Sequence, residues 1–397
     1  MALGLPALAR AEPGYVDCVR GLRGAALQRG VSAAGFDRLT GGLAPDMSVL
    51  ERLDYQPEFK LPIWDYMAAL VDDERIAEGR AMQVRWRDTL SAIEAKYGVD
   101  AATVIALWGV ESNFGKSFGK RPLLVSLSTL SCFGRRQEFF RGEFLAALRI
   151  VDQGNLPVER LVGSWAGAFG HTQFMPSTFM RVAVDFDGDG RRDIIDSIPD
   201  ALASSANYLK LAGWRSRQTW GYEVKLPARF DEAQSGRKNT RTLAQWTKLG
   251  LRALVPGRSK PGASARAQGM PADAKAGLLL PAGLQGPAFL VFRNFEAIYS
   301  YNAAESYALA IAHLADRLRG GGPFVAPWPT DDAGLSRAER RELQALLSAR
   351  GHDIGEIDGM IGSRSRAAIK AEEQRLGLEP TGRAGQKVLR LLRKQPG

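Results

Sequence analysis

With 397 residues, of which 45% are hydrophobic and 24% charged, the chain has the composition of a folded protein of about two domains. This composition excludes a wholly disordered chain, and the lack of any run of roughly 18 apolar residues argues against a transmembrane helix. The formal net charge of +10 favours an anionic partner, such as nucleic acid, acidic lipid or an acidic cell-wall polymer.

The first segment, residues 1–14, contains small residues on both sides of Arg10. This arrangement resembles the cleavage region of a secretory signal, although the charged beginning of such a signal is missing. We therefore expect residues 1–14 to be the remnant of an export signal, and a frayed N-terminus is the alternative that the sequence leaves open.

The two cysteines, Cys18 and Cys132, have neither C-x-x-C spacing nor a nearby cluster of histidines. A zinc site is therefore disfavoured. In an exported protein an isolated pair of cysteines would form one long-range disulfide, whereas two free thiols remain the other outcome.

The order of elements along the chain predicts a mainly α fold. Apolar residues recur at intervals of three and four from about residue 15 to 230, and short strand-like runs follow within residues 218–300. A helical pattern returns at 303–320, and residues 320–334 are rich in Gly, Pro and Asp, as is typical of a linker. Residues 335–394 carry three short helical patterns with Gly-rich turns between them.

The segment ALWGVESNFGKSFGK, residues 106–120, places a carboxylate at the end of an apolar run. Asp100 is a suitable N-cap for a helix on which Val104, Leu107, Trp108 and Glu111 share one face, so we expect Glu111 to point inward. Burial of a carboxylate favours its protonated form, which suits a general acid. An ion pair with an arginine would also explain an inward Glu, and spacing does not decide between the two.

Three motifs follow one another along the chain: GVESNFG at 109–115, GSWAGAFGHTQFMPS at 163–177 and YNAAESYALAIAHLA at 301–315. Together they resemble the membrane-bound lytic transglycosylase B family over residues 15 to 318. The resemblance implies a lysozyme-like helical catalytic domain at 15–319 with a small α+β insertion at about 218–300. It also implies non-hydrolytic cleavage of the β-1,4 bond between N-acetylmuramic acid and N-acetylglucosamine, which leaves 1,6-anhydromuramic acid.

In that family the residue corresponding to Glu111 acts first as the acid and then as the base. The motifs also imply a set of sugar-binding residues: Ser164, Gln173, Tyr208, Tyr301, Asn302 and Tyr307. Tyr208 and Tyr307 lie in apolar helical stripes, so core packing is an equal alternative for both. His171 stands where the family commonly has Tyr, which leaves the role of this position open.

The segment DFDGDGRRDIID, residues 185–196, has the spacing of a calcium loop. Acids stand at positions 1, 3, 5 and 12, and Gly190 stands at the turn. The predicted ligand set is Asp185, Asp187, Asp189, Arg191 and Asp196. Calcium bound here would be structural, and no organic cofactor is expected; a bare acidic loop is the alternative.

The tail at 335–394 resembles a three-helix peptidoglycan-binding domain through Gly355–Gly359 and the RAAI and GLEPTG motifs. We expect peptidoglycan glycan strands as the partner, with proteins of cell-wall synthesis or division as further candidates and no nucleic acid. The expected location is the periplasm, without a membrane anchor.

Four other functions compete with this interpretation. A zinc amidase is disfavoured because His171, His313 and His352 lack ligand spacing. A cysteine transpeptidase would need a His beside a thiol. A hydrolytic muramidase and a non-catalytic wall-binding scaffold remain open alternatives.

Overall fold

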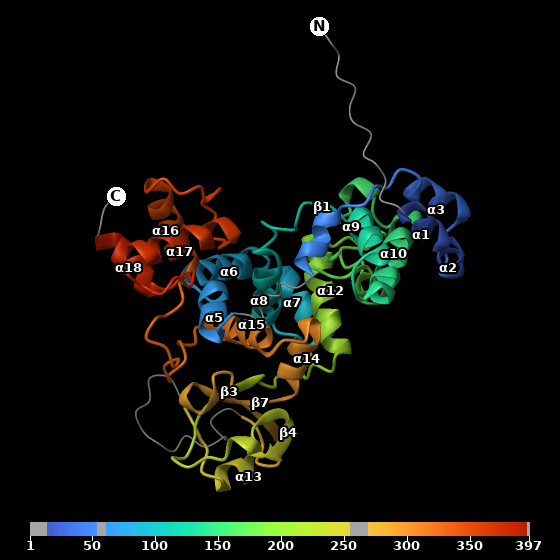
Figure 1. The fold of residues 1–397 in the computed structure, drawn as a ribbon. Coiled ribbons are helices and arrows are strands. Elements are labelled where there is room, and N and C mark those ends of the chain that lie inside the picture. The colour runs from blue at the N-terminus through green and yellow to red at the C-terminus, as the bar shows by residue number, and fades with distance from the viewer. Residues whose placement is uncertain (1–13, 54–60, 255–268, 395–397) are drawn as a thin grey trace. The chain divides into compact units, whose positions relative to one another are not determined.

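The computed structural model describes residues 14–53, 61–254 and 269–394 (Figure 1). Residues 1–13 of the predicted export-signal remnant and residues 255–268 of the predicted insertion lie outside these ranges. The chain separates into two compact units, which are not contiguous in sequence. Unit 1 comprises residues 1–56 and 107–208, and unit 2 comprises residues 57–106 and 209–397.

Unit 1 is built mainly of helices packed on the pair α9 (Leu123–Cys132) and α10 (Gln137–Asp152), which lie side by side (Figure 1). α9 is buried from Leu123 to Ser131 except at Val125. The other elements of this unit include several that contact that pair. These other elements are α1 (Tyr15–Gly21), α2 (Arg23–Gln28), α3 (Ala33–Thr40), η1 (Met47–Arg52), η2 (Val158–Arg160), α11 (Pro176–Val182), most of α12 (Ile198–Leu211) and the two-stranded sheet β1 (Arg121–Pro122) and β2 (Val162–Gly163).

A disulfide between Cys18 and Cys132 joins α1 to the end of α9. Tyr15 is 1% exposed, and its hydroxyl lies 2.7 Å from Ser128 Oγ, which adds a hydrogen bond between the same two helices. Neither cysteine is a free thiol. The N-terminal helix is therefore fixed both covalently and by a buried polar contact.

The helices of unit 2 pack around α15 (Glu305–Leu318), which is rich in alanine and almost entirely buried. α15 contacts α5 (Ile63–Leu70) and α6 (Asp73–Arg85), and α14 (Arg293–Asn302) precedes it. α7 (Arg87–Tyr97) leads to α8 (Ala101–Ser112), whose residues are divided between the two units. Asp100 caps α8 as predicted: Thr103 N donates to Asp100 Oδ1 at 3.1 Å.

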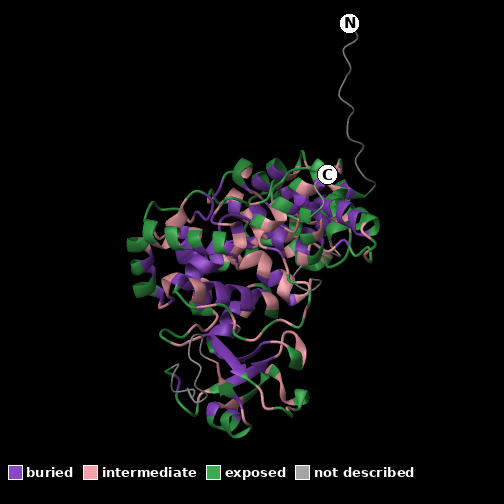
Figure 2. Ribbon diagram, turned by 90° about the vertical axis from the view of Figure 1, so that its left-hand side faces the viewer, coloured by how far each residue is buried: buried purple, intermediate pink, exposed green. Residues whose placement is uncertain are grey.

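The insertion is a five-stranded antiparallel sheet with the order β4-β6-β7-β3-β5. Buried side chains that include Tyr222, Leu243 and Trp246 form the core of the insertion, and Figure 2 shows its buried strand residues in purple. The strands are β3 (Gly221–Lys225), β4 (Gly236–Thr242), β5 (Arg252–Ala253), β6 (Lys275–Leu279) and β7 (Ala288–Val291), with the helix α13 (Leu243–Lys248) and the short turns η3 (Glu232–Gln234) and η5 (Gly283–Gln285).

The strand-like run at 288–295 is only partly a strand, because β7 ends at Val291 and α14 begins at Arg293. The edge strand β4, GRKNTRT, carries no apolar residue, so its residues show no strand pattern. It forms because its backbone pairs with β6.

The tail has the three predicted helices, α16 (Arg337–Ala349), α17 (Ser363–Arg375) and α18 (Gln386–Lys394), around a small apolar core that includes Leu343, Ile369 and Leu389. Ser336 and Glu339 form a capping box at the start of α16. The segment before the tail follows an ordered path, because Glu223 of β3 accepts hydrogen bonds from the backbone amides of Val325 and Ala326, both at 2.7 Å. Val325 and Ala326 lie within the predicted linker, residues 320–334.

Candidate active site

Glu111 stands in the last turn of α8. Val104 and Leu107 are fully buried and Trp108 is 2% exposed, as the shared-face argument predicted, whereas Glu111 itself is only half-buried. The prediction of an inward carboxylate is therefore correct in direction and too strong in degree. The physical reason is that α8 is buried on all sides from Ala102 to Gly109 and reaches the surface only where it ends.

The chain leaves α8 through three successive residues with left-handed backbone. Asn113, Phe114 and Gly115 have φ values of 51°, 58° and 83°. This backbone conformation is costly for Asn113 and Phe114, which are not glycines, so tertiary contacts must hold their backbone in place. Phe114 N donates to Trp108 O at 3.3 Å, and the Phe114 ring folds back edge-on against Trp108, with centroids 5.7 Å apart. This backward fold fixes the helix end that carries Glu111.

His171 holds the same helix end from the 163–177 motif. Trp108 Nε1 donates to His171 Nδ1 at 2.9 Å, and Ser112 Oγ donates to the His171 carbonyl at 2.8 Å. Burial lowers the pKa of His171 to about 4, with a partial opposing effect of Asp193. At neutral pH the ring is therefore uncharged, with Nδ1 as the acceptor and the proton on Nε2. This packing role answers the question that the sequence left open at this position.

Two glycines make these contacts sterically possible. A Cβ on Gly109 would lie 2.7 Å from the Phe114 ring, and a Cβ on Gly115 would lie 2.3 Å from His171 Cε1. Both glycines belong to the first motif, so the motif provides space for the packed rings as well as the acid.

Gly109→Ala should displace the Phe114 ring and with it the backbone beside Glu111. We expect the glycan-cleaving activity that the motifs imply to fall about 10- to 100-fold, since a displacement of about 1 Å of a reacting group can have that effect. Digestion of purified sacculi by the variant and by Gly24→Ala, whose added Cβ meets nothing within 4 Å, provides the measurement and its control. Equal activity of Gly109→Ala and the wild type would contradict this account of the helix end.

Three of the predicted sugar-binding residues belong to unit 1 with Glu111. Ser164 Oγ accepts from Ala168 N at 3.0 Å inside a tight turn. Gln173, with φ at 48°, donates from Nε2 to Gly170 O at 2.8 Å. Tyr208 is half-buried, and its ring lies 6.0 Å from that of Phe174. These contacts orient the three side chains.

The other three predicted residues belong to unit 2 and surround the turn between α14 and α15. The rings of Tyr301 and Tyr307 stack with centroids 6.3 Å apart. Tyr307 is 3% exposed, which fits the packing alternative, whereas Asn302 is exposed and Tyr301 half-buried. Ala303 turns the chain with φ at 50°.

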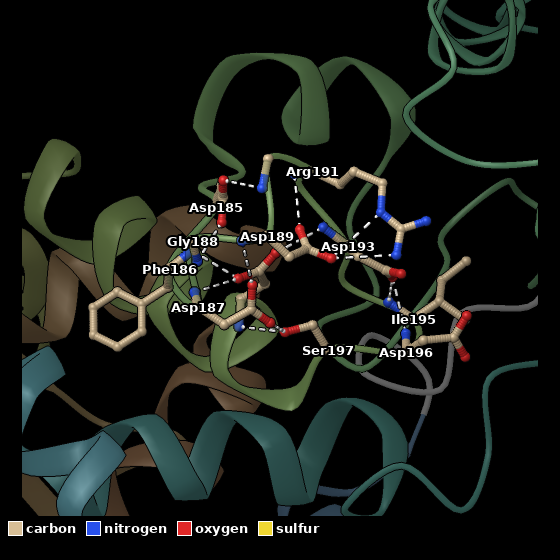
Figure 3. Close-up of polar contacts among 12 residues, drawn as sticks. Asp185, Phe186, Asp187, Gly188, Asp189, Arg191, Asp193, Ile195, Asp196 and Ser197 are labelled. Atoms are coloured by element: carbon tan, nitrogen blue, oxygen red, sulfur yellow. Dashed lines mark hydrogen bonds and ion pairs between the residues drawn. The ribbon is translucent and has the colours of Figure 1, made fainter.

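The acidic loop at 185–196 contains the predicted ligand set, and Figure 3 shows the hydrogen bonds among its residues. Asp185 and Asp187 lie with Asp200 in a group whose carboxylate oxygens are all within 4.8 Å of one another. Asp189 accepts from the backbone and side chain of Arg191. Asp196 forms an ion pair with Arg160. The cluster therefore includes one residue, Asp200, that lies outside the 12-residue pattern.

Asp200 is the functional candidate that the sequence analysis missed. It lies in the first turn of α12, four residues beyond the loop, and is fully buried. Its carboxylate accepts from the amides of Phe186 at 2.7 Å and Asp193 at 2.9 Å. Burial raises the pKa of Asp200, these amides oppose the rise, and Asp187 adds to it.

A zinc amidase and a cysteine transpeptidase find no support in the described residues. Among the described residues, one group of three or more side chains could hold a metal ion. It is the acidic cluster, which contains no histidine. His313 stacks on Phe324 at 3.8 Å, and His352 Nε2 lies 2.9 Å from Glu372. Both cysteines are bonded, so neither offers a thiolate. Within the same ranges, no helix is both long and apolar enough to traverse a lipid bilayer.

Comparison with known proteins agrees with the motifs. Residues 14–316 match the transglycosylase SLT domain, and residues 336–392 match the peptidoglycan binding domain. Membrane-bound lytic murein transglycosylase B of Escherichia coli K12 is 32% identical over 63% of this chain and 65% of its own length, so the chain spans just under two thirds of that relative.

Solved structures extend the similarity over nearly the whole chain. SltB3 from Pseudomonas aeruginosa, in complex with NAG-anhNAM-pentapeptide, is 44% identical with a TM-score of 0.74, covering 96% of this chain and 100% of that one. Escherichia coli Slt35 in complex with calcium is 27% identical with a TM-score of 0.63, covering 77% of this chain and 93% of that one. The chain belongs to the transglycosylase SLT domain family.

Proposed function

We propose that this chain is a lytic transglycosylase that cleaves the β-1,4 bond between N-acetylmuramic acid and N-acetylglucosamine in peptidoglycan and leaves a 1,6-anhydromuramic end. The observation that carries the proposal is the half-buried Glu111 at an end of α8 fixed by Trp108, Phe114 and His171. The relative named as a membrane-bound lytic murein transglycosylase and the SltB3 complex with NAG-anhNAM-pentapeptide support it.

Glu111 would serve both proton transfers. As the acid it protonates the glycosidic oxygen while the bond from that oxygen to C1 of the muramic acid breaks. As the base it then takes the proton of the muramic 6-hydroxyl, whose oxygen forms the new bond to C1. Hydrolytic glycosidases commonly use a second carboxylate as nucleophile or to activate water. Here the substrate's own hydroxyl replaces water, so a single acid suffices.

The sugar-binding residues would orient the strand for this reaction. Ser164, Gln173 and Asn302 offer hydrogen-bonding groups, and Tyr208 and Tyr301 offer aromatic surface for a sugar ring. Tyr307 would support Tyr301 by stacking beneath it. The net charge of +10 favours the acidic polymer, and the tail would hold the enzyme on it.

We also propose a structural calcium ion held by Asp185, Asp187 and Asp200. Three carboxylates this close repel one another without a cation, and oxygen is the ligand that calcium prefers. The calcium-containing Slt35 structure supports the proposal. The Asp200 carboxylate also accepts hydrogen bonds from backbone amides of the loop. Calcium bound by Asp200 would therefore stabilise the backbone conformation of the loop.

Calcium should raise the melting temperature. At a concentration about 100 times its Kd it would stabilise the fold by about 2.7 kcal/mol, a shift of a few degrees. Asp187→Asn should remove most of the shift, while Asp189→Asn, outside the cluster, should retain it. A melting curve and metal content that do not respond to calcium would contradict the site.

The disulfide fits an oxidising compartment such as the periplasm, which is the location we propose. Proteins of cell-wall synthesis or division remain predicted partners. Mass spectrometry of digested sacculi tests the function itself: anhydro ends support the transglycosylase, ends heavier by one water indicate a muramidase, and no release at all indicates a scaffold.

A further inference from the structure

One arginine of the sheet insertion contacts both helices of the turn that carries Tyr301 and Asn302. Arg237 of β4 donates from Nη1 to Glu296 Oε2 at 2.6 Å, and its Nε lies 3.3 Å from Glu305 Oε1. Its guanidinium also lies over the Tyr299 ring, 3.5 Å from the centroid. The side chains of Arg237 and Glu296 are 15% and 17% exposed, so their ion pair is largely shielded from water, whereas the Glu305 side chain is 45% exposed.

Two of the three partners of Arg237 belong to one short segment, residues 299–307, which we term the aromatic turn, and the third, Glu296, precedes it. Glu296 and Tyr299 belong to α14, and Glu305 is the first residue of α15. Between them Ala303 adopts φ of 50°, a costly conformation for alanine, and its amide donates to Tyr299 O at 2.7 Å. Arg237 therefore bridges the two helices on either side of a strained connection.

We propose that Arg237 is a positioning residue for glycan binding, which holds the aromatic turn so that Tyr301 and Asn302 meet the sugar strand. This inference rests on the proposed function, because the assignment of Tyr301 and Asn302 as sugar-binding residues is part of that proposal. It also assigns a role to the sheet insertion, since the polar edge strand β4 supplies the cation that fixes part of the substrate site.

Charge explains why an arginine is required. Burial raises the pKa of Glu305, Arg237 opposes the rise, and the neighbouring Glu296 adds to it, so the two carboxylates repel each other wherever Arg237 is absent. Glu296 Oε1 is buried without a hydrogen-bond partner, and Glu296 therefore depends on the contacts of its other oxygen. Lys238 also reaches that oxygen, at 2.6 Å, but its side chain is 74% exposed, and this ion pair joins it to α14.

The planar guanidinium group of arginine can donate to both carboxylates and also stack on an aromatic ring. The ammonium group of lysine cannot make these three contacts at once. Lysine at position 237 should therefore retain one ion pair and lose the bridge. Arg241, on the same strand, provides a matched control, since its guanidinium contacts Gln234 at 2.7 Å and the Trp246 ring at 5.1 Å, both within the insertion.

The test measures binding of a muroglycan tetrasaccharide by calorimetry in the Glu111→Gln background, where the ligand stays intact. Arg237→Ala should weaken binding about 10-fold or more. Arg237→Lys should lie between Arg237→Ala and the parent, and Arg241→Ala should match the parent. Unchanged binding in Arg237→Ala would overturn the proposal. If Arg237→Ala does not fold, Arg237→Gln and Arg237→Lys answer the same question.

A double-mutant cycle separates positioning from general stability. If Arg237 acts through Tyr301, the variant with both Arg237→Ala and Tyr301→Ala should bind no more weakly than Tyr301→Ala by itself. Additive losses would contradict that route. Failure of the proposed function is recognised separately, since it would show as wild-type digests without anhydro ends, whatever the binding of the Arg237 variants.

Discussion

Glu111→Gln should lower the rate at which fragments are released from purified sacculi by about 10²- to 10⁴-fold, the usual contribution of a positioned acid and base. The amide has nearly the same shape as the protonated carboxyl, yet it can neither give up a proton to the leaving oxygen nor take one from the 6-hydroxyl. Because Glu111 is only half-buried at the helix end, the substitution should leave the fold intact.

Two measurements accompany this rate. Glu138→Gln, which changes an exposed acid of α10 in the same unit, should digest sacculi as fast as the wild type. Binding of intact glycan by Glu111→Gln should persist, since the sugar-binding residues are unchanged. A Glu111→Gln enzyme with wild-type activity would refute the assigned role and favour another acid.

Loss of the Cys18–Cys132 disulfide should destabilise the protein by about 4 kcal/mol, because the bridge closes a loop with a sequence separation of 114 residues. The loss of stability should affect unit 1, where the disulfide joins α1 to α9. Urea unfolding with and without a thiol reductant, monitored by circular dichroism, gives the difference in free energy of unfolding.

The Cys18→Ser, Cys132→Ser double variant supplies the control for the reductant. It should unfold at the lower urea concentration in both conditions and show no further response to reduction. A wild-type transition that is equally insensitive to reductant would mean that the Tyr15–Ser128 hydrogen bond and packing suffice to hold α1.

Local rules predicted those features of the fold whose signals lie close together in sequence. Asp100 precedes the first turn of α8 and caps it, and the tail helices follow from apolar spacing between glycine turns. The strand β4 has no such signal, because its side chains are polar and its place depends on pairing with β6.

The site shows the same division between local and long-range information. The motif around Glu111 identified the acid, but its half-exposure depends on what surrounds α8 on every side. Asp200 was missed because the chain folds back from α12 to the loop, beyond the reach of a 12-residue pattern. The role of His171 likewise depends on a contact with Trp108, 63 residues earlier in the chain.

Digestion of sacculi in H₂¹⁸O tests the central claim most directly. If Glu111 directs the muramic 6-hydroxyl to C1, the released muropeptides carry anhydro ends of unlabelled mass, and no ¹⁸O enters the product. Reducing muramic ends that carry one ¹⁸O would show that water attacks C1, and they would contradict the account.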